Sequence, residues 1–145
     1  MEGTNFPLTG QSTTLPADLA TGMLRYEKGK VYILVKNLGA SLADGKTCKR
    51  DATVGTDITV VVGAAVTDIF IGVNNTGSAI ADGSYFWALK EGRGYSIGST
   101  IALGVSVTGA AAGVVTVAAT TNNVCGQCIV ANSEVMWAFP SKYNV

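Results

Sequence analysis

The sequence contains no histidine and little charge. Because none of its 145 residues is histidine, catalytic arrangements that use an imidazole base, Ser-His-Asp and Cys-His, are excluded. Charged residues make up 14% of the chain, and the 10 basic residues equal the 10 acidic ones in number. A balanced charge gives no general reason to bind nucleic acid. Function therefore has to be argued from architecture and surface.

Cysteine is also scarce. Three residues, Cys48, Cys125 and Cys128, are an odd number for a disulfide framework, so we expect reduced thiols. The last two form a CxxC pair, the spacing found in zinc knuckles and redox sites. A structural zinc site needs two further ligands, and a redox site favours a helix in a βαβ unit, which the sequence does not indicate. We expect no metal and no cofactor here, only cysteines in a strand or turn.

Helical patterns are missing as well. No window of a dozen residues combines helical spacing, capping residues and freedom from glycine. Short apolar runs separated by turn residues are present instead, which favours an all-β domain, either a β-barrel or a β-sandwich of short antiparallel strands. The runs expected to be strands cover residues 31–35, 47–49, 58–62, 68–73, 85–89, 95–97, 105–108, 114–117 and 135–139.

Two divisions follow from this pattern. Residues 1–24 contain two prolines and no regular period, so we expect an extended N-terminal arm that either stays mobile or lies along a neighbour. Residues 25–145 are expected to form a single β-barrel or β-sandwich domain. Within it, residues 90–94 (KEGRG) are expected to be the turn of a hairpin, and 109–113 (GAAAG) a turn of small residues.

One phrase occurs twice, as residues 41–46 (SLADGK) and 79–84 (AIADGS). An Asp-Gly pair readily supplies the backbone angles of a tight turn, so each copy is expected to reverse the chain between two strands. Asp44 and Asp82 are the best candidates for a pair of catalytic carboxylates. The turn explains both of them, and we predict no catalytic residue and no enzyme activity.

The few charges are unevenly distributed. Residues 25–51 contain seven basic and three acidic residues, whereas residues 94–133 contain no charge at all. The basic stretch could bind a phosphate backbone, but we expect a solvated face or a contact with an acidic protein surface. The uncharged stretch could be taken for a membrane span, yet its hydroxyl residues and its period of two favour buried strands or a subunit contact. We expect neither nucleic acid nor membrane as a partner.

Five short motifs resemble the capsid decoration (cement) proteins of tailed bacteriophages. They are residues 26–36 (YEKGKVYILVK), 42–46 (LADGK), 81–94 (ADGSYFWALKEGRG), 101–105 (IALGV) and 113–115 (GVV). The resemblance covers about residues 25–118. It implies a non-enzymatic virion protein that binds the major capsid protein on the outer capsid surface as a homo-trimer and stabilises the shell. It brings no catalytic residues, and it fits production in the host cytoplasm, since the first residues do not look like a secretory signal peptide.

Two other functions stay open at this point. In the first, the chain is a carbohydrate- or receptor-binding module of a phage fibre or tail tip, and Tyr85, Trp87, Tyr95 and Trp137 form an aromatic platform. Tyr85 and Trp87 share one face of their strand, as core residues also would, and we expect the core. In the second, the chain is a small hydrolase with paired carboxylates, for which the sequence shows no convergent acid and base.

Overall fold

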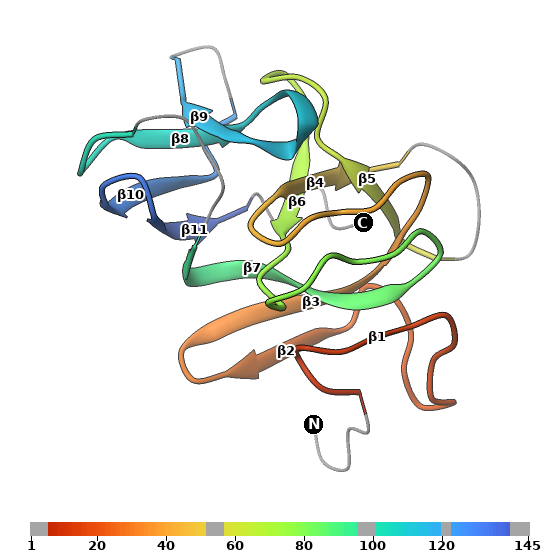
Figure 1. The fold of residues 1–145 in the computed structure, drawn as a ribbon. Helices are drawn as coiled ribbons and strands as arrows, with labels where there is room; N and C mark the ends of the chain where they lie inside the picture. The colour runs from red at the N-terminus through yellow and green to blue at the C-terminus, as the bar shows by residue number, and fades with distance from the viewer. Residues whose placement is uncertain (1–5, 52–56, 96–100, 120–122, 140–145) are drawn as a thin grey trace.

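The computed structural model describes residues 6–51, 57–95, 101–119 and 123–139. Within them the chain is all-β, with one short 3₁₀ turn and no α-helix (Figure 1). The elements are β1 (Gln11–Ser12), β2 (Leu24–Glu27), β3 (Lys30–Asn37), β4 (Thr47–Arg50), β5 (Thr59–Val62), β6 (Phe70–Val73), β7 (Tyr85–Tyr95), β8 (Ser106–Gly109), η1 (Ala111–Gly113), β9 (Val115–Val117), β10 (Gly126–Val130) and β11 (Glu134–Ala138).

Five of these strands close into a barrel. Their order is β3-β5-β4-β6-β7, and β7 closes the ring by pairing with β3 as well as with β6. The β3–β5 pair is parallel, and the other pairs of the ring are antiparallel. Alternate residues point inward, so Ile33 and Val35 of β3 meet Phe86 and Ala88 of β7 in the barrel core, all fully buried. The predicted all-β single-domain fold is confirmed.

Strand β7 runs through residues 90–94 without turning, so the hairpin predicted there is wrong. Its first half pairs with β3 and its second half with β11, which places it in the barrel and in a second sheet (Figure 1). Gly92 and Gly94 allow side chains of neighbouring residues to lie close to the backbone of β7. A Cβ at Gly94 would lie 2.3 Å from Asn75 Oδ1, and one at Gly92 would lie 2.9 Å from Lys30 Cγ. Residues 96–100, which include part of the expected second strand of that hairpin, lie outside the described residues.

The second sheet continues from β7 in the order β11-β10-β8-β9. Its inner face packs on the end of the barrel, where Trp137 and Val107 join Phe70 in one buried cluster. The predicted small-residue turn between β8 and β9 is present, with η1 inside it. Small residues are needed there because a Cβ at Gly109 would lie 2.3 Å from Phe70 Cε1.

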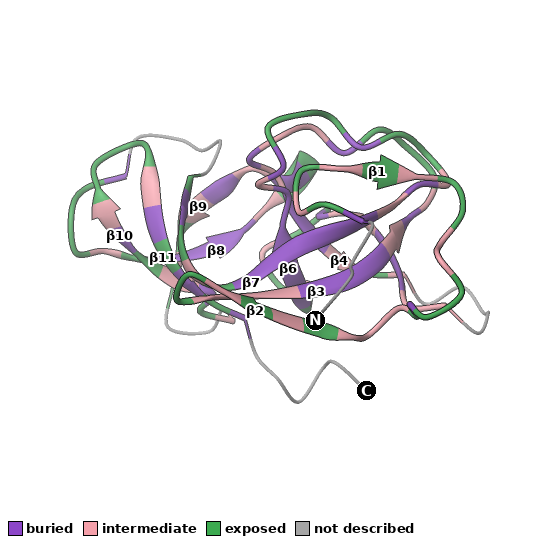
Figure 2. Cartoon of the chain, turned by 90° about the horizontal axis from the view of Figure 1, so that it is seen from below, coloured by how far each residue is buried: buried purple, intermediate pink, exposed green. Residues whose placement is uncertain are grey.

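Residues 6–24 lie against the outer face of β3 and β7, on the chain's own barrel (Figure 2). Phe6 and Leu19 are buried there together with Leu34 and Trp87, and Trp87 Nε1 donates a hydrogen bond of 3.1 Å to the Phe6 carbonyl oxygen. Strand β1 adds a short pairing with the start of β7. The apolar residues of this segment therefore gain their order from contacts within the same molecule, where we had expected a mobile arm or a neighbour.

Candidate functional site

The two Ala-Asp-Gly turns, 43–46 and 81–84, have the same geometry. In each, the fourth N–H donates to the first carbonyl oxygen at 3.2 Å, and the glycine has a φ of 79°. A positive φ at the third position defines a type II turn and requires glycine. The predicted tight turn that reverses the chain between two strands is confirmed for both copies, because β6 and β7 are antiparallel and β4 runs opposite to β5, which is parallel to β3. The strands β3 and β4 are not themselves neighbours in the sheet. The two turn phrases pair with each other, through Leu42 and Ile80.

The aspartate of each turn accepts a hydrogen bond from the loop that precedes the other turn. Asp82 Oδ1 accepts the Gly39 N–H at 2.7 Å, and Asp44 Oδ1 accepts the Gly77 N–H at 3.0 Å. Asp44 Oδ1 also accepts a hydrogen bond of 2.6 Å from the Tyr95 hydroxyl. Burial is the largest cause of a raised pKa of Tyr95, and the neighbouring Asp44 raises this pKa further. Both carboxylates therefore serve as acceptors in the scaffold.

Two buried asparagines complete this reciprocal arrangement. Asn37 Nδ2 donates to the carbonyl oxygens of Ile80 and Ala81 in the second phrase, at 3.1 and 3.3 Å. Asn74 Nδ2 donates to Leu42 in the first phrase at 3.0 Å. The chain thus contains two related units, each a strand with an asparagine at its end or directly after it, followed by a glycine loop and an Ala-Asp-Gly turn. Sequence reasoning missed the asparagines, because aligning the two turn phrases places Asn37 opposite Asn75 and not opposite Asn74.

The aromatic residues do not form a surface platform. Trp87 and Trp137 are each 1% exposed, which confirms that they belong to the core. Tyr85 packs against the N-terminal segment, its hydroxyl donates to Asp57 at 2.8 Å, and Lys36 Nζ lies 5.1 Å from its ring centre. Tyr95 is exposed, but its hydroxyl is bound to the scaffold. A carbohydrate site built on all four side chains is therefore not formed.

All three cysteines are free and buried. Burial raises the pKa of Cys48 to about 12, and burial also raises the pKa of Cys125. Cys128 lies in β10, as expected of a cysteine in a strand, and its Sγ contacts the Val130 carbonyl oxygen at 3.3 Å. Among the described residues no group of three or more Asp, Glu, Cys or His side chains is placed to hold a metal. These thiols are core groups.

The β2–β3 hairpin and β7 together present two exposed basic residues, Lys28 and Arg93, and a half-buried one, Lys30. We call these three residues, together with the exposed Tyr26 and Tyr95, the hairpin surface. Two small hollows, of about 210 and 180 Å³, share Lys30 as a lining residue. Tyr26 is 73% exposed. Arg93 is paired with Glu134, whereas Lys28 and Lys30 form no ion pair within the described part of the chain.

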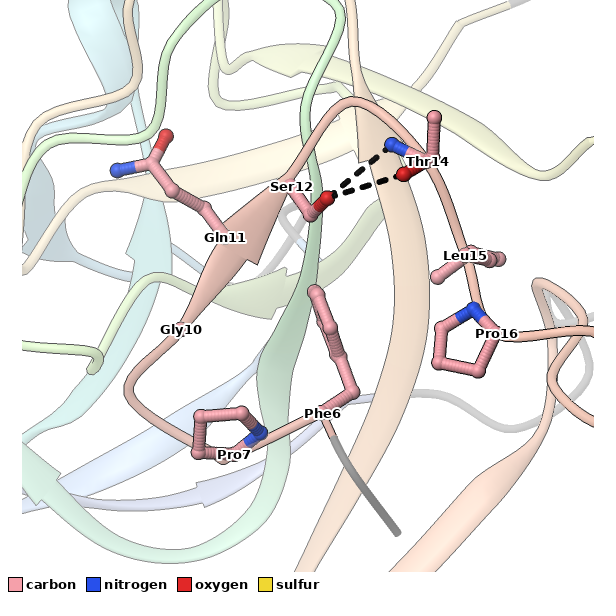
Figure 3. A pocket seen from close by; sticks show the side chains of 8 residues that line it. All are labelled: Phe6, Pro7, Gly10, Gln11, Ser12, Thr14, Leu15 and Pro16. Carbon is pink, nitrogen blue, oxygen red and sulfur yellow. Dashed lines mark hydrogen bonds between the residues drawn. The ribbon is translucent and has the colours of Figure 1, made fainter.

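A larger hollow, of about 480 Å³, lies within the N-terminal segment (Figure 3). Its lining comes from residues 6–16 and includes no charged side chain. Ser12 Oγ accepts the Thr14 N–H at 3.2 Å and lies 3.4 Å from its hydroxyl, so these polar groups already contact each other.

None of the family models, curated proteins and solved structures compared with this chain matches it. In the described part of the chain, no helix has the length and apolar character needed to cross a membrane.

Proposed function

We propose that the chain is a non-enzymatic virion protein that decorates and stabilises the outer surface of a phage capsid by binding the major capsid protein as a homo-trimer. The resemblance on which this rests involves the scaffold. Its longest motifs, residues 26–36 and 81–94, lie in the β2–β3 hairpin and in β7 with the turn before it. If the role of a protein is to present a rigid surface in many copies, we expect its sequence to resemble that of its relatives in the residues that form the scaffold.

One observation supports the proposal most: the side chains best suited to chemistry are used to build the fold. Asp44 and Asp82 accept loop N–H groups, and both tryptophans are in the core. The features left for function are outer surfaces, and broad surface contact is how a decoration protein acts. Modest contacts repeated over many copies would hold a shell by avidity.

The hairpin surface is the best candidate for the contact with the capsid protein. Lys28 has a φ of 50°, in the left-handed region that costs a non-glycine residue about 1 kcal/mol. A glycine would fit there more easily, so lysine at this position suggests that its charge is used. Lys30 lines the same hollow as Lys28, and neither lysine forms an ion pair with a described residue. The surface would therefore suit an acidic patch on the shell.

The experiment compares capsid shells with and without the purified protein. We expect the protein to co-sediment with shells and to raise the temperature at which they rupture. Lys28→Glu should weaken shell binding about tenfold or more, because a lost and reversed charge contact of this kind is worth about 1.4 kcal/mol or more.

Lys46→Glu is the matched control, since it makes the same change of charge at a turn outside the hairpin surface, and it should bind shells like the native protein. If the native protein neither binds shells nor changes their rupture temperature, the proposed function is wrong. If Lys46→Glu and Lys28→Glu weaken binding equally, the hairpin surface is not the contact.

A further inference from the structure

A small hollow beside the β2–β3 hairpin brings together two lysines and a tyrosine hydroxyl. Its volume is about 210 Å³, and we call it the lysine hollow. Three parts of the chain line it: the N-terminal segment, the hairpin with Glu27, Lys28, Lys30 and Tyr32, and the loop after β6 with Asn75. These groups lie far apart in the sequence and meet only in the folded chain.

The two lysines of the hollow have no internal partner for their charge. Glu27 lies opposite Lys30 in the register of the hairpin, a position from which opposite charges often pair. The Glu27 carboxylate instead forms an ion pair of 2.8 Å with Arg25. Neither Lys28 nor Lys30 forms an ion pair with a described residue, so both ammonium groups can bind an external anion.

Lys30 and Tyr32 are also held in place by packing. The stem of Lys30 lies on the backbone of β7, because a Cβ at Gly92 would lie 2.9 Å from Lys30 Cγ. The half-buried ring of Tyr32 packs against two apolar clusters, while its hydroxyl forms no hydrogen bond with a described residue. Burial, and after it the charge of Glu27, raises the pKa of Tyr32, so the hydroxyl keeps its proton and can donate. Side chains that are already fixed lose little conformational entropy on binding a ligand.

We propose that the lysine hollow binds a single carboxylate group, with the ammonium groups of Lys28 and Lys30 and the hydroxyl of Tyr32 as donors. Hydrogen bonds to an ionised group are about twice as strong as neutral ones. The volume suits a small group, since pockets for drug-sized ligands measure about 300–1,000 Å³. Glu27 also lines the hollow, so a singly charged carboxylate meets less repulsion there than a phosphate dianion.

Two kinds of molecule carry such a group: a protein with an aspartate or glutamate side chain, and a free sugar acid. Under the proposed function the carboxylate belongs to an acidic side chain of the capsid protein, and to that extent the inference rests on the proposed function. The binding of a carboxylate as such does not depend on it. We therefore test the site without shells.

The test follows the NMR signals of the full-length protein as sodium acetate is added at constant ionic strength. We expect the amide signals of Lys28 and Lys30 and the ring signals of Tyr32 to shift and to saturate at roughly millimolar acetate, an affinity within reach of so small a ligand. Lys30→Gln should weaken this binding about tenfold, and Tyr32→Phe, which removes only the hydroxyl, at least threefold.

Lys46→Gln and Tyr26→Phe are the matched controls, because they make the same two changes outside the lysine hollow. Both should bind acetate like the native protein. Amide spectra that match the native one away from the hollow show that each variant is folded. The inference is overturned by shifts that do not saturate, by tighter binding of phosphate than of acetate, or by native affinity in Lys30→Gln and Tyr32→Phe.

Two further ligands distinguish the sources of the carboxylate. A capped peptide with one glutamate represents a protein, and sodium glucuronate represents a free sugar acid. Tighter binding of the peptide supports an acidic side chain of the capsid protein as the ligand, whereas tighter binding of glucuronate contradicts that source. Because no shell is present, a failure of capsid binding cannot produce any of these results.

Discussion

Single polar residues stabilise this fold mainly by bonding the backbone of loops. Asp82 and Asp44 each accept an N–H from the loop of the other unit, and Asn37 and Asn74 reach into the opposite turn phrase. Loops 38–42 and 75–80 connect strands of the barrel, and each contributes one buried side chain, Leu42 or Ile80, to the barrel core. The two units thus fix each other, which explains why both copies carry the same turn sequence.

Replacing Asp82 tests this reciprocal bonding. Asp82→Ala removes the acceptor of the Gly39 N–H, and we expect the free energy of unfolding to fall by about 1 kcal/mol, the usual worth of one such hydrogen bond. Urea denaturation measures the change. Asp18→Ala is the control, since Asp18 is exposed and makes no side-chain bond among the described residues. Equal stability of the two variants would contradict a structural role for Asp82.

The lowered pKa of Asp68 predicts how the stability of the fold depends on pH. Burial favours its neutral form, but N–H groups of Ala64 and Ala65 and the ammonium of Lys49 outweigh this and lower the pKa of Asp68 below its usual value of 3.8. A carboxylate with a lowered folded-state pKa stabilises the fold above its unfolded pKa and loses that contribution as pH falls through the folded pKa.

The variant Asp68→Asn should therefore be less stable than the native protein at pH 7, and the difference should shrink below about pH 4. Urea midpoints measured from pH 7 down to pH 3 test this. A difference that stays constant over that range would show that ionisation of Asp68 contributes nothing.

At the scale of elements, the N-terminal segment acts as a cover for the barrel. It buries the outer face of β3 and β7, including Leu34 and Trp87, which would otherwise face water. Sequence reasoning read residues 1–24 as an arm because the segment has no period of its own. The segment is ordered by packing on an apolar face of β3 and β7, whose residues are distant from it in the sequence. The local sequence of the segment therefore gives no sign of this contact.

Phe6→Ala should open this cover. Removing a ring that is 4% exposed is expected to cost about 3 kcal/mol of stability. Trp87 should then gain access to water, and its emission should shift to the red in a Trp137→Phe background, where it is the only tryptophan. Pro7→Ala, at an exposed neighbouring position, should change neither quantity. A Trp87 emission that Phe6→Ala leaves unchanged would rule out the contact described.

The strands themselves could largely be predicted, because their apolar runs and turn residues are local signals. The order of the strands could not. The segment 90–94 looks like a turn, with two glycines among charged residues, but pairing with β3 and β11 on its two halves keeps it extended. Strands β2 and β10 were missed, since one is rich in charge and the other holds the CxxC pair. The sequence predicted that Asp44 and Asp82 belong to tight turns, whereas their bonding partners in the other unit depend on long-range packing.

For the whole molecule, the sheet order separates two different surfaces. The hairpin surface lies at β2, β3 and β7, and β11, β10 and β8 stand between β7 and β9. Charge is concentrated near the hairpin surface and missing from residues 94–133. Under the proposed function, the shell contact is therefore expected at the hairpin surface and not at the far end of the second sheet.

Salt should therefore weaken the proposed contact with the shell. Raising the ionic strength shortens the screening length from about 10 Å at 0.1 M to about 3 Å at 1 M, so shell binding through Lys28 and Lys30 should weaken over that range. Co-sedimentation with shells over this range of salt concentrations measures the change in binding. Shell binding that stays the same from about 0.1 M to about 1 M salt would contradict a charged contact through Lys28 and Lys30.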